Sequence, residues 1–318
     1  MKRKHKISAI IACYKDTKAI PLMYKRLTST FKKLGTDYEI IFVNDGSPDN
    51  TEDILKKLVN KDSHIIAVNH SRNFSSQMAF TSGMDISLGD AVVLLDGDLQ
   101  DPPEVIEKFY KKWLEGYDVV YGVRTKREAP FYMKFAYKLF YRIFKYLSFI
   151  NIPLDAGDFS LMDRKVVDIL KTLPERDRFI RGLRAWVGYK QIGISYVRPE
   201  RVFGKSTNSL LKNLNWALKG IFSFSYAPLE AMTVLSLITF FFALALMTIQ
   251  IILRLVLPYT PPGTATILVV VLFLGAVQLL SISILGQYIG KISEEVKKRP
   301  KYVVKSIFRR NYKEKLDN

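Results

Sequence analysis

Short apolar runs alternate with longer segments of helical periodicity through the first half of the chain. The apolar runs have the length and the β-branched residues of strands, at Ile7–Cys13, Tyr38–Asn44, His64–His70, Ala91–Asp96 and Asp118–Gly122. Helices are predicted between them, near Thr17–Leu34, Asp49–Asn60, Ser76–Ser87 and Pro103–Glu115. Ser47 and Pro48 fit the N-cap and the first helical position of the second helix. This alternation predicts an α/β fold with a parallel sheet, whose ligands bind at the carboxyl ends of the strands.

Two long runs without charge, Ala231–Leu253 and Thr264–Gly290, lie near the C-terminus. Each exceeds the roughly 20 residues that a helix needs to cross a bilayer. The connector Arg254–Gly263 is short, so the runs predict a transmembrane hairpin whose two ends face the same side. Lys and Arg residues in the tail from Lys291 indicate that this side is the cytoplasm. The alternative is a pair of buried core helices in a soluble protein.

Two further stretches combine aromatic and basic residues. Over residues 130–149, basic side chains recur at three- and four-residue steps among aromatic and aliphatic ones, which predicts an amphipathic helix lying in a membrane interface. The alternative is a helix that packs on the core with a solvated basic face. A second stretch of this kind runs over Ser209–Tyr226.

Composition changes this picture in two respects. The 318 residues carry a formal net charge of +18, which attracts polyanions, either nucleic acid or an anionic membrane surface. The apolar runs favour the membrane, and we expect no nucleic-acid partner. Cys13 is the one cysteine in the chain, so no intramolecular disulfide forms, and its place in a predicted strand indicates a small buried residue.

Carboxylates follow two of the predicted strands. Asp96 and Asp98 flank a glycine directly after the fourth strand, and Gln100 and Asp101 come next. Two carboxylates at this spacing suit a hard divalent cation, Mg²⁺ or Mn²⁺, whose shell phosphate oxygens complete. Asp45 ends the second strand, where a carboxylate can accept a hydrogen bond from a ring N–H of a nucleobase. A turn or helix-capping aspartate is the alternative for Asp45.

Charged residues further along the chain are candidates for the rest of a site. Asp155 and Asp158 lie in a predicted turn that contains a glycine, where Asp158 could orient an acceptor or act as a base, or be a simple turn carboxylate. Arginine forks suit phosphates, although most surface arginines are only solvated. The basic candidates around predicted loops are Arg124, Arg127, Arg198, Arg201 and Lys205.

The order of these motifs resembles a known family. The chain contains in turn IIACYKD, VNDGS, LDGDLQDPP, AGDFSL, FIRGLRAWVG and RVFGKS, followed by the two apolar runs. Over residues 7–290 it resembles glycosyltransferase family 2, and within it the polyprenyl-phosphate sugar transferases, which are the bactoprenol glucosyltransferases and the dolichol-phosphate mannose synthases. The resemblance implies a GT-A nucleotide-binding fold and transfer with inversion at the anomeric carbon.

The resemblance also implies roles for individual residues. Tyr14 and Asp16 would line the nucleotide pocket, Asp45 would bind the base, and Asp158 would be the catalytic residue. Asp96 and Asp98 match the metal-binding pair, with Asp98 the direct ligand and Gln100 assisting. Positions associated with the acceptor phosphate correspond to Arg124 and Arg201, with Arg127 and Lys205 as further candidates.

Three departures from the family pattern bear on this assignment. Ala12 and Lys15 replace the usual proline and asparagine of the first motif, and the shifted place of Lys205 leaves its role open. The Gln-x-x-Arg-Trp motif of processive synthases is missing, which favours a single transfer over polymerisation.

The predicted organisation has four parts. A cytoplasmic GT-A catalytic domain spans residues 1–205 and includes the interfacial helix 130–149; an amphipathic interface helix spans 206–227, two transmembrane helices lie in 228–290, and a basic cytoplasmic tail spans 291–318. The expected reaction moves a hexose from a nucleotide sugar, with UDP-glucose first, to undecaprenyl phosphate. GDP-mannose or a modified pentose donor, a non-enzymatic membrane protein, and association into a homo-oligomer stay open.

Overall fold

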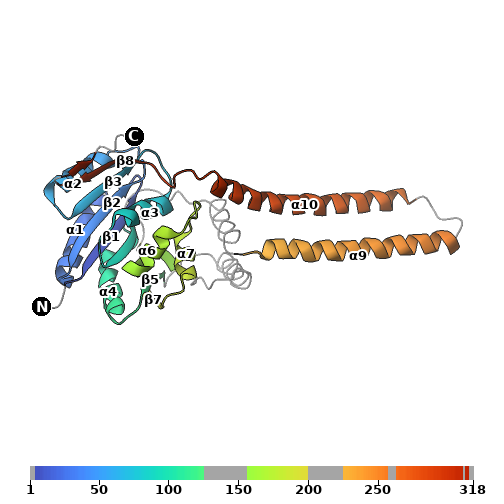
Figure 1. Cartoon of the computed structure of the whole chain (residues 1–318), viewed down its shortest axis with the longest axis horizontal. Helices are drawn as coiled ribbons and strands as arrows, with labels where there is room; N and C mark the ends of the chain where they lie inside the picture. Colours follow the sequence, from blue (N-terminus) through green and yellow to red (C-terminus); the bar gives the residue numbers. More distant parts are fainter. Residues whose placement is uncertain (1–3, 125–155, 200–224, 257–262, 311, 315–318) are drawn as a thin grey trace.

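A nine-stranded sheet forms the centre of the N-terminal domain (Figure 1). The computed structural model describes residues 4–124, 156–199, 225–256, 263–310 and 312–314. The strands are β1 (Lys6–Cys13), β2 (Asp37–Asn44), β3 (Ile65–His70), β4 (Ala91–Asp96), β5 (Val119–Arg124), β6 (Ala156–Asp163), β7 (Gln191–Tyr196), β8 (Val304–Arg309) and β9 (Tyr312–Glu314). Their order is β7-β5-β6-β4-β1-β2-β3-β8-β9.

Parallel pairing dominates the middle of the sheet. Strands β3, β2, β1 and β4 are neighbours and run parallel, and β5 and β7 are parallel to each other. Antiparallel β6 lies between β4 and β5, and antiparallel β8 extends the sheet beyond β3. The prediction of a mostly parallel α/β sheet of the GT-A kind is confirmed, and the five predicted strands each lie within about two residues of the observed ones.

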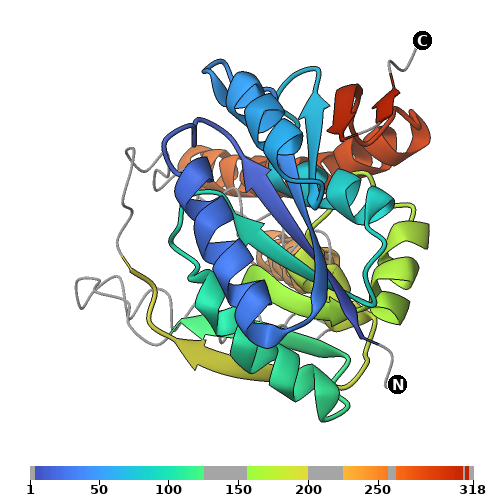
Figure 2. The same cartoon turned by 90° about the vertical axis from the view of Figure 1, so that its left-hand side faces the viewer.

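Helices cover both faces of the sheet, as Figure 2 shows. Successive strand residues point to opposite faces, so Ile11 packs with α1 (Ile20–Leu34), α2 (Thr51–Lys61) and α4 (Ile106–Leu114), which follows the 3₁₀ turn Pro103–Val105. Ile10 and Ala12 pack on the other face with α3 (Ser76–Ile86), α6 (Arg164–Thr172) and α7 (Ile180–Trp186). The central strands are buried on both sides, which explains why they are continuous apolar runs.

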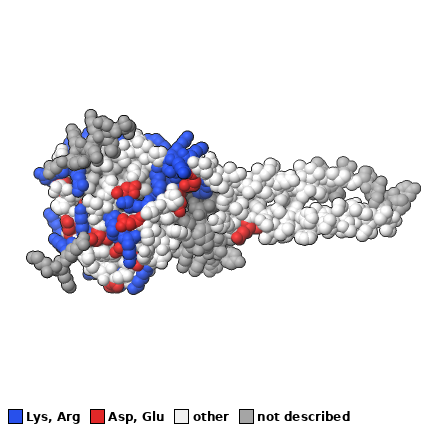
Figure 3. Space-filling model, viewed as in Figure 1, with Lys and Arg blue, Asp and Glu red and all other residues white. Residues whose placement is uncertain are grey.

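Two long helices, α9 (Ala227–Val256) and α10 (Thr264–Val296), extend side by side away from the domain (Figure 1). Both are long and apolar enough to cross a membrane, and none of the residues in their most apolar stretches is buried inside the molecule. In Figure 3, the surface of α9 and α10 is almost free of charged side chains, whereas the N-terminal domain has many Lys and Arg side chains on its surface. The lack of burial argues against core helices, and the two helices indicate association with a membrane.

The structure differs from the sequence predictions in three places. Asn50 precedes α2 at its N-cap position, so Ser47 and Pro48 belong to the preceding loop and the predicted cap is wrong. Residues after α10 include strand β8, which joins the sheet, where the sequence indicated only a basic tail. The predicted helix 130–149 and residues 206–224 of the second amphipathic stretch lie outside the described residues.

Candidate active site

The sequence-predicted carboxylates converge at the carboxyl ends of the central strands. Asp45 follows β2, Asp96 ends β4, and Asp158 lies in β6 beside it. The turn predicted around Asp158 is wrong, because this residue belongs to an antiparallel strand that pairs with both β4 and β5. The site therefore combines the edge expected for parallel strands with one strand that runs the other way.

Asp45 is buried, with 2% of its surface exposed, and within the described residues one carboxylate oxygen makes all the hydrogen bonds of its side chain. Its Oδ1 accepts from the backbone N–H of Phe74 at 2.8 Å and lies 2.9 Å from Nδ1 of His70. Among the described residues, Oδ2 has no hydrogen-bond partner. A carboxylate held by one oxygen keeps the other available for a donor of a ligand.

The loops after β1 and β2 are joined by hydrogen bonds. The backbone N–H of Lys15 donates to the Ser47 hydroxyl at 2.8 Å, and that hydroxyl donates to Asp49 at 2.6 Å. Burial opposes the charge of Asp49, but hydrogen bonds from Ser47, Thr17 and Thr51 lower its pKa to about 2. The two loops thus form one connected wall of the site.

Tyr14 and Asp16 lie in the first of these loops. Tyr14 is 40% exposed, and its backbone N–H donates to Asp16 Oδ2 at 3.0 Å. The loop approaches the metal-binding motif closely, since a Cβ on Gly97 would come within 2.9 Å of the Ala12 carbonyl oxygen and 3.0 Å of Asp16 Oδ2. This contact gives a physical reason for the glycine between Asp96 and Asp98.

A cluster of acidic side chains surrounds Asp96. Burial, and then the charges of Asp101, Asp98 and Asp158, raise the pKa of Asp96 to about 8. Asp98 is largely buried, and its Oδ1 accepts from the backbone N–H of Gln100 at 3.1 Å. Repulsion of this kind marks a site where a cation would stabilise the ionised form of the carboxylates.

The cluster fits a metal ion that takes few ligands from the protein. Within the described residues, no three His, Cys, Asp or Glu side chains converge as a complete ligand set. Mg²⁺ and Mn²⁺ commonly take one or two carboxylates and fill the remaining positions with phosphate oxygens and water. Asp98 and Asp96 would supply the carboxylates here, and the assisting role of Gln100 stays a prediction.

Asp158 is held at one oxygen, as Asp45 is. Its Oδ2 accepts from Gln77 Nε2 at 3.0 Å and lies 3.4 Å from Arg181 Nη2. Its Oδ1 is buried without a hydrogen-bond partner among the described residues. Gln77 also accepts the backbone N–H of Ile180 at 2.8 Å, so it ties the start of α7 to the carboxylate. Asp158 is fixed in orientation beside a positive charge.

Arginines surround the acidic cluster. Burial opposes the charge of Arg124, but Asp101 and Tyr196 outweigh it and raise the pKa of the guanidinium. Arg198 Nε lies 3.8 Å from Asp101 Oδ1. Burial lowers the pKa of Arg184 to about 10 in spite of nearby Asp158. Each of these guanidiniums has an Nε with no hydrogen-bond partner among the described residues, so donors remain for a ligand.

The structure adds residues that the sequence did not assign to the site. They are Gln77, His70, Arg181, Arg184 and Tyr196. The two arginines lie three apart in FIRGLRAWVG and so share a helix face, a signal that the sequence contained. Nothing in the local sequence of Gln77 or His70 indicates their partners. The predicted Asp155, Arg127, Arg201 and Lys205 lie outside the described residues.

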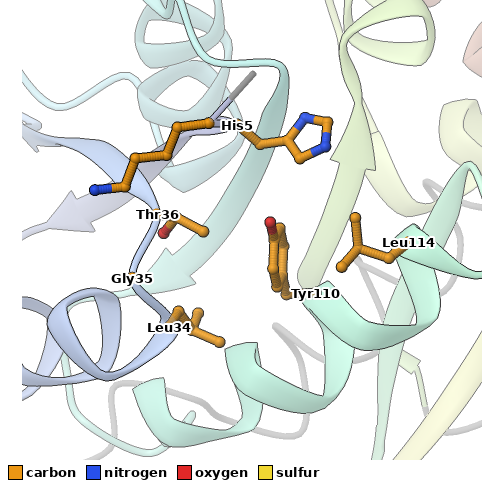
Figure 4. A pocket seen from close by; sticks show the side chains of 7 residues that line it. His5, Leu34, Gly35, Thr36, Tyr110 and Leu114 are labelled. Carbon is orange, nitrogen blue, oxygen red and sulfur yellow. The ribbon is translucent and has the colours of Figure 1, made fainter. Parts of the chain in front are cut away.

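A pocket of about 680 Å³ lies away from these residues (Figure 4). His5, Leu34, Thr36, Tyr110 and Leu114 are among the residues that line it, and they come from the start of β1 and the ends of α1 and α4. These segments lie at the opposite ends of the strands from Asp45 and Asp96. The pocket is therefore separate from the acidic site.

Comparison with known proteins gives consistent matches. Residues 8–170 match the family model described as Glycosyl transferase family 2. An uncharacterized glycosyltransferase of Synechocystis is 42% identical over 310 residues, covering 96% of both chains. The SfII prophage-derived bactoprenol glucosyl transferase of Shigella flexneri is 40% identical over 307 residues, covering 96% of this chain and 99% of the other. The structure of a Pyrobaculum calidifontis mannosyltransferase with GDP-Man and Mn²⁺ is 15% identical, covers 88% of both chains and has a TM-score of 0.43.

Proposed function

The chain belongs to glycosyl transferase family 2, an inverting family of glycosyltransferases, and we propose that it transfers glucose from UDP-glucose to undecaprenyl phosphate. The observation that carries this proposal is the similarity to the bactoprenol glucosyl transferase of Shigella flexneri, which extends over 96% of the chain and so includes the two apolar helices. The acidic cluster and the arginines around it support the proposal that the substrate carries a diphosphate.

The donor would lie along the joined loops after β1 and β2. Asp45 Oδ2 would accept a ring N–H of the base, and Tyr14 and Asp16 lie in the neighbouring loop. Asp98 and Asp96 would hold Mg²⁺ or Mn²⁺, which when bound neutralises charge on the diphosphate leaving group. Arg124 and Arg198 lie near the same cluster, where their charge would stabilise phosphate oxygens of the donor or of the acceptor.

The acceptor supplies its own nucleophile. A phosphate monoester has a second pKa of about 6, so near pH 7 it is mostly a dianion. One of its oxygens attacks the anomeric carbon in line, a new C–O bond forms with inversion, and the bond to the nucleoside diphosphate breaks. No proton has to be removed from the nucleophile. Asp158, fixed by Gln77 and Arg181, would orient a substrate through its unpartnered Oδ1 rather than act as a base.

The long apolar helices support a place for this reaction at the cytoplasmic membrane. A polyprenyl tail stays in the bilayer, and the phosphate must reach the site from the membrane surface. We infer that the catalytic domain and both termini are cytoplasmic, from the basic residues that follow α10.

A donor panel tests the proposal. The full chain in detergent micelles, with undecaprenyl phosphate and Mn²⁺, would be given UDP-glucose, GDP-mannose and a UDP-pentose, and the released nucleoside diphosphate measured. We expect release with UDP-glucose that depends on the lipid phosphate. Preference for GDP-mannose or the pentose would overturn the choice of donor, and no lipid-dependent release with any donor would overturn the transferase reaction.

A further inference from the structure

The segment that follows the second membrane helix reaches the candidate donor pocket. Residues Val304–Arg309 pair as β8 with β3, and His70 at the end of β3 faces Val304. Just before β8, the ring of Tyr302 stacks on the ring of His70, with centroids 5.3 Å apart and planes 13° from parallel. The Tyr302 hydroxyl donates to Asp85 Oδ2 on α3 at 2.6 Å, which fixes the tyrosine at its other end.

His70 connects this segment to Asp45. The histidine is buried, with Nδ1 2.9 Å from Asp45 Oδ1 and Nε2 2.9 Å from the Ser82 hydroxyl on α3. Because an ionised carboxylate only accepts hydrogen bonds, Nδ1 carries the proton and donates. The imidazole is thus held on one face by Tyr302 and at both nitrogens, and its donation fixes which oxygen of Asp45 stays open.

A second chain of hydrogen bonds runs parallel to the first. Asn69 donates to the Ser306 hydroxyl of β8 at 3.1 Å and accepts from Asn44 Nδ2 at 2.9 Å. Asn44 Oδ1 in turn accepts the backbone N–H of Ser47 at 3.0 Å. The turn that carries Asp45 is therefore connected to β8 on both sides.

We propose that His70 is a positioning residue for recognition of the donor base, and that Tyr302 of the segment after the second membrane helix is part of the donor site through it. The ligand class is a nucleoside diphosphate whose base presents a ring N–H to Asp45. This inference deepens the proposed function and rests on its assignment of Asp45 to the base.

Two substitutions of His70 separate its hydrogen bond from its stacking. The amide nitrogen in His70→Asn takes roughly the place of Nδ1 and can still donate to Asp45, whereas the ring in His70→Phe can stack on Tyr302 but cannot donate. If the hydrogen bond positions Asp45, His70→Phe should weaken UDP binding about tenfold or more, and His70→Asn should retain more of the affinity. Tyr302→Leu should weaken it by roughly three- to tenfold.

Tyr24 offers a matched control for Tyr302. Its hydroxyl donates to Asp62 Oδ2 at 2.9 Å, the same kind of bond as between Tyr302 and Asp85, and it has no described contact with the Asp45 turn. Tyr24→Leu should leave UDP affinity unchanged. Thermal unfolding of each variant would identify any that do not fold.

The experiment is calorimetric titration of the full chain in micelles with Mn²⁺, using UDP, GDP and inorganic diphosphate as probes. A positioning role predicts that the variants lose affinity for UDP while affinity for diphosphate, which has no base, stays within about twofold. Equal losses for both probes, or equal effects of His70→Asn and His70→Phe, would overturn the inference. If the unchanged chain bound diphosphate but neither UDP nor GDP, the proposed function itself would be wrong.

Discussion

Individual carboxylates in this site differ in what their surroundings let them do. Asp45 and Asp158 each have one oxygen fixed by protein donors and one buried oxygen that has no hydrogen-bond partner within the described part of the chain. Asp96 is instead crowded by Asp98, Asp101 and Asp158, and its pKa is raised to about 8. These surroundings fit the proposed roles, in which Asp45 and Asp158 would orient polar groups of a ligand and Asp96 would share a cation.

Asp98→Ala should remove most of the activity. The substitution deletes the carboxylate that we propose as the direct metal ligand, so we expect at least a hundredfold loss in kcat, about 2.7 kcal/mol of barrier. Chelation of divalent ions should abolish transfer in the unchanged enzyme. Steady-state assays with the surface variant Asp168→Ala as control check this, and full activity in chelator would contradict it.

Asp158→Asn tests whether this residue is a base. The amide can keep the orientation but cannot take a proton, so kcat should fall while the shape of the pH profile stays. If the acceptor phosphate provides the acidic limb, activity should rise through about pH 6 and level off above about pH 7, because the dianion is the nucleophile. A limb present in the unchanged enzyme and lost in the variant would instead identify Asp158 as the titrating group.

Arg124→Ala should show which substrate the guanidinium binds. An arginine–phosphate contact contributes roughly 1.5–3 kcal/mol. If the contact is with the acceptor and equally strong in ground and transition states, KM for the lipid phosphate rises and kcat changes little. Arg124→Lys should not restore binding, because lysine lacks the two-pronged fork. A two-substrate titration in mixed micelles decides this, and a rise in the donor KM alone would move Arg124 to the leaving group.

At the level of elements, the sequence predicted the continuously apolar strands better than the strands that contain polar or charged residues. Strands β1 to β5 are apolar on both faces, and their composition therefore predicts them as strands. Strand β6 begins with Ala156, Gly157 and Asp158, which resemble a turn in sequence, and β8 contains Lys305 and Arg309. Both need partners far along the chain, and these partners cannot be read locally.

The site shows the same division. Asp45, Asp96 and Asp98 follow predicted strands, so the sequence could bring them together at one edge of the sheet. Gln77 and Asp158 are 81 residues apart, and their contact depends on how α3 packs against β6. The local sequence pattern does not predict such contacts, because they depend on tertiary packing.

The turn after β2 should tolerate little change. Gly46 has φ of +61°, and a Cβ there would come within 2.3 Å of the Arg72 backbone carbonyl carbon. Gly35 has nearly the same φ, +65°, and a Cβ there would meet none of the described residues within 4 Å. Gly35→Ala should therefore cost only the conformational strain of about 1–2 kcal/mol. Gly46→Ala should cost clearly more, measured by thermal unfolding, and equal losses would show that the turn can move aside.

At the scale of the whole molecule, the sheet connects the two ends of the hairpin. The chain enters α9 from the N-terminal domain, and after α10 it returns to that domain as β8. Close contacts fasten the junction, with Lys291 Nζ 3.1 Å from Asp177 and the Arg176 backbone N–H donating to Glu295 at 2.7 Å. If the two helices cross a membrane, the chain must therefore cross it an even number of times, because both ends of the hairpin are held by the same domain.

This connection leads to a labelling prediction for the topology. If the basic tail marks the cytoplasmic side, only about ten residues around Pro258–Gly263 should be exposed outside. The natural Cys13 is 1% exposed and should react poorly, so single cysteines can be introduced without removing it. In intact cells, an impermeant maleimide should label Thr260→Cys and should label Asn318→Cys only after permeabilisation. Because β8 fixes both ends of the hairpin to one domain, labelling at both positions in intact cells would contradict the hairpin, and the reverse pattern would invert its orientation.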